Sequence, residues 1–446
     1  MKVIQAVGWY FPESSGGTEV YVSQLASELR QYGVICSIAA PHNGTSPYFY
    51  SHDDTEVYRY PVNTVWDLKQ IRGLYPHDGF DEFRRWLSEQ DAEIYHQHSL
   101  TSGCSLHHLE AAREAGKKTL MTIHVPSPIC LKGTLIRIGA EACDGVIDTV
   151  KCGVCSGAAR GMPMWAANLM ARAPLPFSRF AERRLPQSRL TTALARPALV
   201  EAHRRNLTRL ASMSDRVIAV CQWLYDTLAA NGVPKEKLVL SRQGAFDSGA
   251  VTADSNGYSQ NNVEGAALRV GYLGRWDKVK GIHVLVEAVR KLPRSVKIEL
   301  LIYAQAQNKE GEIYRDEVSR IAADDERIHI SDALGRDAVP SALSSFDILA
   351  VPSQWLETGP LVILEAFAVG VPVLGSNLGG IAELVQHGEN GLLVDYSDTQ
   401  AWSDSISALA SNRQLLNKLR EGIKPPRNAK TVADEMASIY RSVLEQ

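Results

Sequence analysis

The sequence lacks any run of about 18 uninterrupted apolar residues, the length that a membrane-spanning helix needs. Its first 15 residues lead into strand-like sequence without the basic region and cleavage site of a signal peptide. A strong net charge is also missing, because the 446 residues carry a formal charge of −3. A surface built as a whole for nucleic acid is therefore excluded. We expect a cytoplasmic protein without a nucleic-acid partner.

Cysteine is scarce, with seven residues in the chain. An odd number in so long a chain argues against a secreted disulfide framework. Four of them fall close together, and the last two form a Cys-x2-Cys pair: Cys130, Cys143, Cys152 and Cys155. Four thiolates can complete a tetrahedral Zn²⁺ site or hold an iron–sulfur cluster, and we favour a structural zinc. Four free or buried thiols are the alternative. A thiolate-saturated metal would have no open position for catalysis.

Short β-branched runs alternate with helical patterns along the whole chain, which predicts an α/β protein. A chain of 446 residues with 45% apolar content is too long for one ordinary core. Buried parallel strands are expected at residues 2–7, 35–40, 92–98 and 118–125, with a crossover helix at 18–33. We assign residues 1–246 to a first Rossmann-like domain that contains an insertion at about 128–210.

The alternation restarts in the second half, with strands expected at residues 268–275, 296–304, 327–331, 346–353 and 371–376. We assign 268–425 to a second doubly wound domain and the Gly-, Ser- and Asn-rich segment 247–267 to a linker. A C-terminal helix at 426–446 is expected to pack back toward the first domain. Two such domains leave a cleft at the carboxyl ends of their strands, where ligands of α/β folds bind.

Two glutamates flank a Gly-Pro step just after the strand expected at 346–353. Pro360 suits the first position of a helix, where its missing N–H is not needed. Glu357 then lies beside the helix start, whose amides attract anions, and Glu365 lies inside the helix. Upstream, Arg275 and Lys280 are two cations able to hold a diphosphate leaving group. The alternative is that all four are ordinary surface residues.

Three quoted segments carry a family resemblance: "SSGGTEVYV", "GRWDKVKG" and the run from "VPSQWLETGP" to "NGLLV". With them the sequence resembles the retaining, nucleotide-sugar-dependent glycosyltransferases of the GT-B fold, family four (glycosyl transferases group 1). The match is dense in the second half and scattered in the first. It implies two facing Rossmann-like domains and transfer of a hexosyl group from a UDP- or GDP-sugar to a glycan or lipid-linked acceptor. It also implies retained anomeric configuration and no catalytic metal or cofactor.

The resemblance further implies residue roles. Glu365 would bind the ribose hydroxyls, Glu357 would approach the donor sugar, and Arg275 and Lys280 would contact the pyrophosphate. His124, at the end of the strand 118–125, would lie near the reacting sugar. Further donor-binding positions are Ser353, Thr358, Gly359, Pro360, Leu361 and Val362, together with Gly16 and Gly17. The alternative for the two glycines is that they form an ordinary βα turn.

Two departures from the family pattern leave the donor open. Tyr303, Ala304 and Gln305 stand where relatives often have Gly-x-Gly, and 357–360 replaces the usual Glu-Gly-Phe-Gly. Alternatives of other classes are a GT-B epimerase, a glycoside hydrolase with both carboxyls flanking the scissile bond, and a non-catalytic binding protein.

The segment 160–209 is both basic and apolar. It holds ten arginines and only two acidic residues, Glu182 and Glu201, with Met, Trp, Leu and Phe interleaved. This composition is typical of a surface that lies on anionic lipid at the inner face of a membrane, or of a wall that faces a phosphate-bearing acceptor. An Arg-rich insertion packed on the domain is the alternative.

Overall fold

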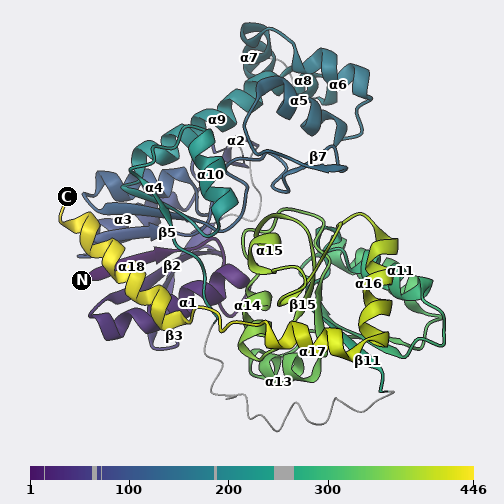
Figure 1. Cartoon of the computed structure of the whole chain (residues 1–446). Helices are drawn as coiled ribbons and strands as arrows, with labels where there is room; N and C mark the ends of the chain where they lie inside the picture. Colours follow the sequence, from purple (N-terminus) through teal and green to yellow (C-terminus); the bar gives the residue numbers. More distant parts are fainter. Residues whose placement is uncertain (15, 63–67, 72, 185–187, 246–265) are drawn as a thin grey trace. The chain divides into compact units, whose positions relative to one another are not determined.

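The computed structural model describes residues 1–14, 16–62, 68–71, 73–184, 188–245 and 266–446. It divides the chain into an N-terminal unit, Met1–Gln243 with Ala429–Gln446, and a C-terminal unit, Gly244–Asn428 (Figure 1). Nearly all of the linker expected at 247–267 lies outside the described residues. Among the helices in the described ranges, none is long and apolar enough to cross a membrane.

An eight-stranded sheet forms the centre of the N-terminal unit, in the order β10-β9-β6-β5-β1-β2-β4-β3. Its pairs are parallel except for the hairpin β3–β4. The strands are β1 (Lys2–Ala6), β2 (Ile35–Asn43), β3 (Tyr48–His52), β4 (Thr55–Val62), β5 (Ile94–Gln97), β6 (Lys118–Ile123), β9 (Arg216–Ala219) and β10 (Leu238–Leu240). The four strands expected from the sequence are confirmed as β1, β2, β5 and β6, whereas the other four were not predicted.

Helices cover this sheet. They are α1 (Gly17–Leu29), η1 (Arg30–Tyr32), α2 (Leu68–Ile71), α3 (Phe80–Glu89), α4 (Leu106–Glu114), α10 (Gln222–Ala230) and α18 (Ala429–Leu444). The C-terminal α18, yellow in Figure 1, packs along α1. Its buried face repeats every three to four residues, with Val432, Met436, Tyr440 and Val443 almost fully buried. This apolar stripe ties the end of the chain to the unit in which the chain begins.

An insertion lies between β6 and β9. It contains the short hairpin β7 (Ile136–Arg137) and β8 (Glu141–Ala142), and the helices α5 (Thr149–Ala158), α6 (Met164–Ala171), α7 (Leu175–Arg184), α8 (Arg189–Leu194) and α9 (Arg196–Met213). The long α9 contacts α5 and α7 as well as α4, so it joins the insertion to the layer of helices over the sheet.

The C-terminal unit has a six-stranded parallel sheet in the order β13-β12-β11-β14-β15-β16. Its strands are β11 (Leu268–Arg275), β12 (Ile298–Gln305), β13 (Ile328–Ser331), β14 (Ile348–Val351), β15 (Val373–Ser376) and β16 (Gly391–Val394). Numbered along the chain, the order reads 3-2-1-4-5-6, the doubly wound order of dinucleotide-binding folds. The five strands expected here are confirmed.

Helices cover both faces of this second sheet, and each face has its own apolar cluster. They are η3 (Lys278–Lys280), α11 (Ile282–Lys291), α12 (Lys309–Ala322), η4 (Arg336–Ala338), α13 (Val339–Ser345), α14 (Leu361–Ala368), α15 (Gly379–Leu384), α16 (Thr399–Ser411) and α17 (Arg413–Glu421). One cluster holds residues of α11, α12, α16 and α17, and the other holds residues of α13, α14 and α15. The strand pattern and these helices confirm the predicted α/β class.

Candidate active site

Lys280 and Glu357 meet at the point where the strand order of the C-terminal sheet reverses. Lys280 follows β11 and Glu357 follows β14, and these two strands are paired neighbours. Connections leave β11 and β14 in opposite directions, which opens a crevice at their carboxyl ends. There the Lys280 Nζ lies 2.6 Å from the Glu357 Oε1. The topology thus brings together two residues 77 positions apart.

The loop that carries Lys280 is shaped by close backbone contacts. The Asp277 side chain caps the turn η3 by accepting the Val279 N–H at 3.1 Å. Gly281 ends the turn with φ of 72°, and a Cβ at this position would lie 1.9 Å from the Pro352 carbonyl oxygen. The Val279 carbonyl in turn accepts the N–H of Gln354 at 2.7 Å. Only glycine permits this approach, which holds Lys280 against the end of β14.

Glu357 is nearly fully buried and three groups converge on its Oε1. Besides Lys280, the Ser353 hydroxyl donates at 2.8 Å and the Trp355 indole N–H donates at 2.9 Å. Burial by itself would raise the pKa of Glu357, but the Lys280 charge and these hydrogen bonds outweigh it, so the pKa lies below its ordinary value. The Glu357 carboxylate is therefore ionised and fixed in orientation.

The backbone around Glu357 is held from a second side by the start of α15. The Gly380 N–H donates to the Glu357 carbonyl at 2.6 Å. A Cβ at Gly380 would stand 2.7 Å from the Thr358 carbonyl carbon, so a side chain does not fit there. Thr358 is buried, and Gly359 has φ of 155°. The Gly379-Gly380 pair at the start of α15 thus supports the loop that carries Glu357.

Glu365 lies inside α14, which begins one residue later than expected. Pro360 is the N-cap and Leu361 is the first helical residue, because Pro360 keeps an extended ψ of 118°. The Glu365 carboxylate faces Arg336 at 3.9 Å. Burial raises the pKa of Glu365 and the Arg336 charge partly offsets this. Glu365 therefore has its own cationic partner.

Arg275 is exposed at the end of β11. Its Nη1 donates to the Gln307 Oε1 at 2.8 Å. The structure thus brings Lys280, Glu357 and Ser353 together, whereas Arg275 contacts Gln307 and Glu365 contacts Arg336. The roles expected for Arg275 and Glu365 stay predictions.

Several residues of the site were not singled out from the sequence. The Trp355 ring lies 5.4 Å from the Lys280 Nζ, in cation–π geometry, as well as bonding Glu357. Its position within "VPSQWLETGP" was the available signal. Arg336 and Gln307 stand outside every quoted motif, so no local pattern pointed to them.

The three residues that depart from the family pattern have different surroundings. Tyr303 stacks on Phe346 with ring centroids 6.3 Å apart, and Ala304 is buried in the core. Gln305 is exposed, and its carbonyl accepts the Trp276 N–H at 2.9 Å. Of the three, only the Gln305 side chain is available at the end of β12.

His124 directly follows β6 in the N-terminal unit and is buried. Its Nε2 lies 3.1 Å from the His98 Nδ1, and its Nδ1 lies 3.3 Å from the Gln243 Nε2. The His98 Nε2 lies 2.8 Å from the Gln5 Oε1. If Gln243 donates to His124, each imidazole can be neutral and donate to the next group.

His96 of β5 continues this network. Its Nδ1 lies 2.7 Å from the Tyr440 hydroxyl and its Nε2 lies 2.7 Å from the Thr122 hydroxyl. The Gln5 amide donates to the Tyr440 hydroxyl at 3.0 Å. Tyr440 comes from α18, so the C-terminal helix completes a buried hydrogen-bond network of the sheet. Burial lowers the pKa of His96 and of His124 to about 3.

Acid should destabilise the N-terminal unit through these histidines. In the unfolded chain each takes up a proton below about pH 6.5, whereas in the folded unit His96 and His124 stay neutral down to about pH 3. Their stabilising contribution is therefore complete above pH 6.5 and is lost as the pH falls toward 3, by roughly 2 kcal/mol per histidine between pH 7 and pH 5. Urea unfolding at both pH values measures this loss. His124→Gln should show a weaker pH dependence, and equal stability of the native chain at both pH values would contradict the prediction.

Gly16 and Gly17 stand at the start of α1, with Gly16 as the N-cap. The Glu19 carboxylate, which accepts a hydrogen bond from Ser14 at 2.9 Å, covers this end, because a Cβ at Gly16 would lie 2.7 Å from the Glu19 Oε2. A buried carboxylate at a helix start disfavours a second anion. The donor-binding place expected at Gly16 and Gly17 thus carries the Glu19 carboxylate.

All seven cysteines are free thiols. Among the residues that the structure describes, no group of three or more His, Cys, Asp or Glu side chains is already arranged to hold a metal ion. The structural zinc therefore stays a prediction.

Solved structures share the fold of this chain over nearly its whole length. It superposes on Anabaena HepE, solved with UDP and glucose, with a TM-score of 0.64 and 16% identity over 98% of this chain and 99% of that one. A sucrose-phosphate synthase from Thermosynechococcus elongatus gives 0.67 and 18% identity over the whole of both chains. These structures have the GT-B fold of two Rossmann-like domains, which is therefore the fold of this chain.

Protein-family models match both halves of the sequence. Residues 16–242 match the glycosyl transferase 4-like domain, and residues 259–425 match glycosyl transferases group 1. The chain belongs to the group 1 glycosyltransferases, which confirms the predicted family.

Individual curated relatives align with a smaller part of the chain. D-inositol 3-phosphate glycosyltransferase of Corynebacterium efficiens is 29% identical over 179 residues, which are 38% of this chain and 42% of that protein. N-acetyl-alpha-D-glucosaminyl L-malate synthase of Bacillus anthracis is 29% identical over 181 residues, 39% of this chain and 45% of that protein. The chain thus matches less than half the length of these curated relatives.

Proposed function

We propose that this chain transfers a hexosyl group from a UDP- or GDP-sugar to a glycan or lipid-linked acceptor, with retention of anomeric configuration and without a catalytic metal. The observation that carries the proposal is the ion pair of the partly exposed Lys280 with the buried Glu357 at the reversal point of the C-terminal sheet. Ligands of doubly wound sheets bind at that point. Family membership supports the same chemistry.

The charges of this pair match the charges that develop during transfer. As the bond to the leaving diphosphate breaks, negative charge grows on the phosphate oxygen and positive charge grows on the anomeric carbon. An ammonium has three donors, so the Lys280 bond to Glu357 leaves capacity for a phosphate oxygen. The ionised Glu357 would stabilise the sugar cation. Both groups are fixed before substrate binds, which avoids reorganisation during the reaction.

We assign the rest of the donor to α14 and its neighbours. The first amides of α14, at Leu361 and Val362, would bind the diphosphate together with Arg275 once this side chain leaves Gln307. Glu365 would accept hydrogen bonds from the ribose hydroxyls. Its contact with Arg336 keeps a carboxylate available there, although burial raises its pKa. Thr358 and Gly359 would line the sugar.

In the N-terminal unit, His124 would be a neutral hydrogen-bonding group for the substrate, because burial holds its pKa near 3. Gly16 and Gly17 would contact sugar hydroxyls in preference to a phosphate, since the Glu19 carboxylate covers the start of α1. Hydroxyl groups can donate to that carboxylate, whereas a phosphate would be repelled.

Calorimetric titration with a panel of UDP-, GDP- and ADP-sugars tests the donor assignment. We expect one nucleotide to bind in the presence of EDTA, and Glu365→Ala to weaken this binding by roughly 10-fold or more, as for loss of a hydrogen bond to a charged group. Glu326→Ala, which changes an exposed glutamate of the same unit just before β13, is the control. NMR of the product gives the anomeric configuration. Absence of nucleotide binding, or epimer formation without acceptor, would contradict the proposal.

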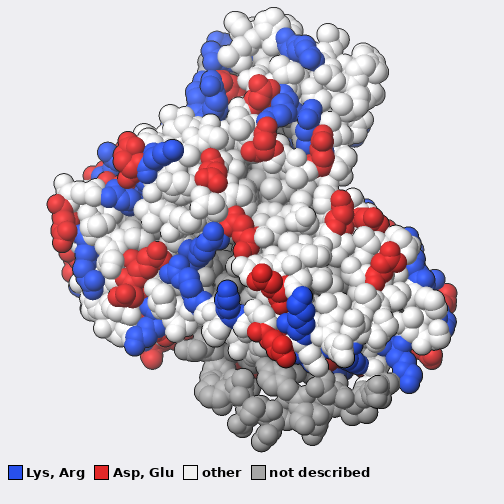
Figure 2. All heavy atoms as spheres, in the orientation of Figure 1, with Lys and Arg blue, Asp and Glu red and all other residues white. Residues whose placement is uncertain are grey.

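We also propose that the insertion contacts the anionic inner surface of a membrane, where a lipid-linked acceptor would be presented. Large apolar side chains are exposed on three consecutive helices, with Trp165 73% exposed. The others are Met164 and Leu169 on α6, Phe177 and Phe180 on α7, and Leu190 on α8. On the face shown in Figure 2 the tip formed by α6–α8 is mostly uncharged, with Lys and Arg side chains beside it and some Asp and Glu side chains among them. Apolar side chains flanked by cations are typical of interfacial binding.

Vesicle sedimentation measures this contact. Vesicles with phosphatidylglycerol should retain the protein at low salt, whereas neutral phosphatidylcholine vesicles should retain less, because the flanking cations attract anionic headgroups. Trp165→Ser with Leu169→Ser should abolish retention. Ile313→Ser should leave retention unchanged, because Ile313 is an apolar residue of the C-terminal unit, 66% exposed but outside the insertion. Equal retention of the double variant, or dimer formation without vesicle binding, would contradict the proposal.

A further inference from the structure

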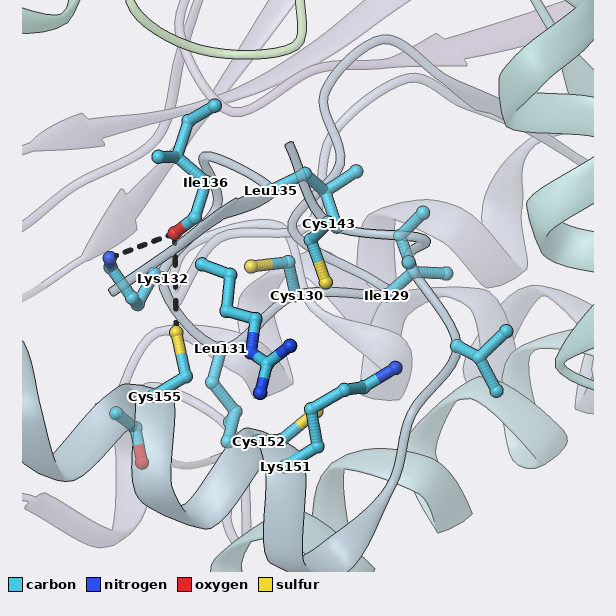
Figure 3. Close-up of a pocket in the computed structure, with 14 residues that line it drawn as sticks. Ile129, Cys130, Leu131, Lys132, Leu135, Ile136, Cys143, Lys151, Cys152 and Cys155 are labelled. Carbon is cyan, nitrogen blue, oxygen red and sulfur yellow. Dashed lines mark hydrogen bonds between the residues drawn. The ribbon is translucent and has the colours of Figure 1, made fainter. Parts of the chain in front are cut away.

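Four of the seven cysteines line a single pocket in the insertion. Figure 3 shows Cys130, Cys143, Cys152 and Cys155 around it. They come from three separate segments: the loop after β6, the residue after β8, and α5. The remaining three cysteines are buried one by one elsewhere in the N-terminal unit. Thiols from three segments in one small pocket call for an explanation other than apolar packing.

Helix α5 has two faces with different residues. Gly153 and Gly157 face α6, because a Cβ at Gly153 would lie 2.9 Å from the Ala171 Cβ and one at Gly157 would lie 3.1 Å from the Ala167 Cβ. Cys152 and Cys155 are three positions apart and so share a face, about 150° away around the helix from the glycine face. One face of α5 is therefore used for close helix packing and the other presents two thiols to the pocket.

The hairpin β7–β8 and the loop before it form the other side of the pocket. The Cys143 N–H donates to the Leu135 carbonyl at 2.8 Å, which places the residue after β8 beside the loop before β7. The Cys130 carbonyl accepts the Gly133 N–H at 2.9 Å, so Cys130 starts a tight turn of the same loop. Two thiols thus come from the hairpin side and two from the helix side.

One backbone N–H and three cationic side chains lie beside the thiols. Ile138 has φ of 53°, which is rare for a β-branched residue, and its N–H donates to the Cys155 Sγ at 3.4 Å. Lys132, Arg137 and Lys151 also line the pocket. One divalent ion with four thiolates carries a net charge of −2, and such a centre needs cations and N–H donors nearby. Of these cations, Arg137 also pairs with Glu141 and Lys151 also pairs with Asp144.

The insertion also has little apolar core of its own. In its described part, the cluster under α5 and α6 consists of Val154, Ala167 and Ala171, with Val150 and Met162 at its edge. Small structural units with so little buried apolar surface are usually held by a metal or by disulfides. The cysteines are free thiols, so no disulfide serves here.

We propose that Cys130, Cys143, Cys152 and Cys155 bind one Zn²⁺ in a tetrahedral thiolate site that holds the hairpin β7–β8 against α5. Four S–H bonds break, four Zn–S bonds form, and four protons pass to water. In the described residues no three ligands already converge on one point, so the thiols turn inward to Zn–S distances of about 2.3 Å. In Figure 3 the Cys155 thiol points to the Ile136 carbonyl, so this side chain would have to turn to reach the metal. The site is structural, because four thiolates leave no open position.

Metal analysis of the full chain, purified under reducing conditions, tests the site. We expect about one zinc per chain, falling below about one tenth in Cys152→Ser and Cys155→Ser, as expected when a structural ligand is lost. Cys36→Ala, which removes a buried thiol of β2, should keep its zinc. If the serine variants do not fold, Co²⁺ titration of the chelator-stripped native chain serves instead, since tetrahedral thiolate ligation gives intense visible absorption.

Alkylation distinguishes the outcomes further. With zinc bound, the four thiols should resist iodoacetamide until a chelator is added, and the chelator should also expose the insertion to protease. Iron with labile sulfide in place of zinc, two disulfides in the native chain, or a native chain that binds neither Zn²⁺ nor Co²⁺ would overturn the proposal. Loss of zinc without loss of nucleotide-sugar binding would support it and would leave the proposed transferase function intact.

Discussion

Replacing Lys280 by alanine is expected to lower kcat by about 10²- to 10³-fold, the usual cost of removing one fixed donor to a developing negative charge. The ammonium contacts the Glu357 Oε1 at 2.6 Å, and its neighbours are fixed by the close approach of Gly281 to Pro352. Steady-state kinetics with the nucleotide sugar found by calorimetry measures the effect. The donor KM should change less than kcat, since Lys280 acts chiefly on the charge that appears as the bond breaks.

Lys278→Ala is the matched control. Lys278 lies in the same turn two residues earlier and is exposed, so its removal should leave kcat within about two-fold, as for most surface substitutions. Lys280→Ala has a second readout. Without the Lys280 charge, burial would raise the pKa of Glu357, so the residual activity should require a higher pH than that of the native chain. Equal kcat values for both variants would show that Lys280 does not act on the leaving group.

Substituting Gly281 by alanine is expected to destabilise the C-terminal unit by about 2–5 kcal/mol, because the left-handed conformation and the clash with the Pro352 carbonyl both act against a Cβ. The clash is severe, since the Cβ would lie 1.9 Å from that oxygen. Any relaxation must move the loop that carries Lys280, so kcat should fall as well. Urea unfolding and kinetics of the same variant measure the two effects.

Gly388→Ala separates the two causes. Gly388 has φ of 79° in the same unit, but nothing lies within 4 Å of a Cβ there. Its substitution should cost only the strain of the left-handed conformation, about 1–2 kcal/mol, and should not change kcat. If Gly281→Ala and Gly388→Ala destabilised the unit equally, the contact with Pro352 would have no energetic importance.

Much of the C-terminal unit was predictable from the sequence. Strands such as β14 and β15 are buried along their whole length, so each appears as a short apolar run between turn residues. Strand, helix and glycine signals are local, and they placed Lys280 and Glu357 at the ends of two strands. β11 pairs with β14 through residues that are 78 positions apart in the sequence. The doubly wound strand order predicts this pairing.

Other parts were not predictable, because contacts over long sequence distances decide them. The hairpin β3–β4 and the strands β9 and β10 belong to a sheet whose order no local pattern reveals. Arg275 donates to Gln307, a residue outside every motif, so no local pattern pointed to this contact. The Cys-x2-Cys pair was visible as a motif, but its place opposite the hairpin β7–β8 depends on the glycine face of α5 and its packing on α6.

The order of short apolar runs and helical patterns, together with the spacing of glycines, acids and cations, determined the α/β class, the family and the residues at strand ends, because each signal is confined to a few neighbouring positions. Tertiary structure alone decided which of these residues share a partner. Lys280 reaches Glu357, Glu365 reaches Arg336, and Tyr440 of the last helix reaches His96 of an early strand. Hydrogen bonds and ion pairs act over about 3 Å, so they depend on how distant segments pack.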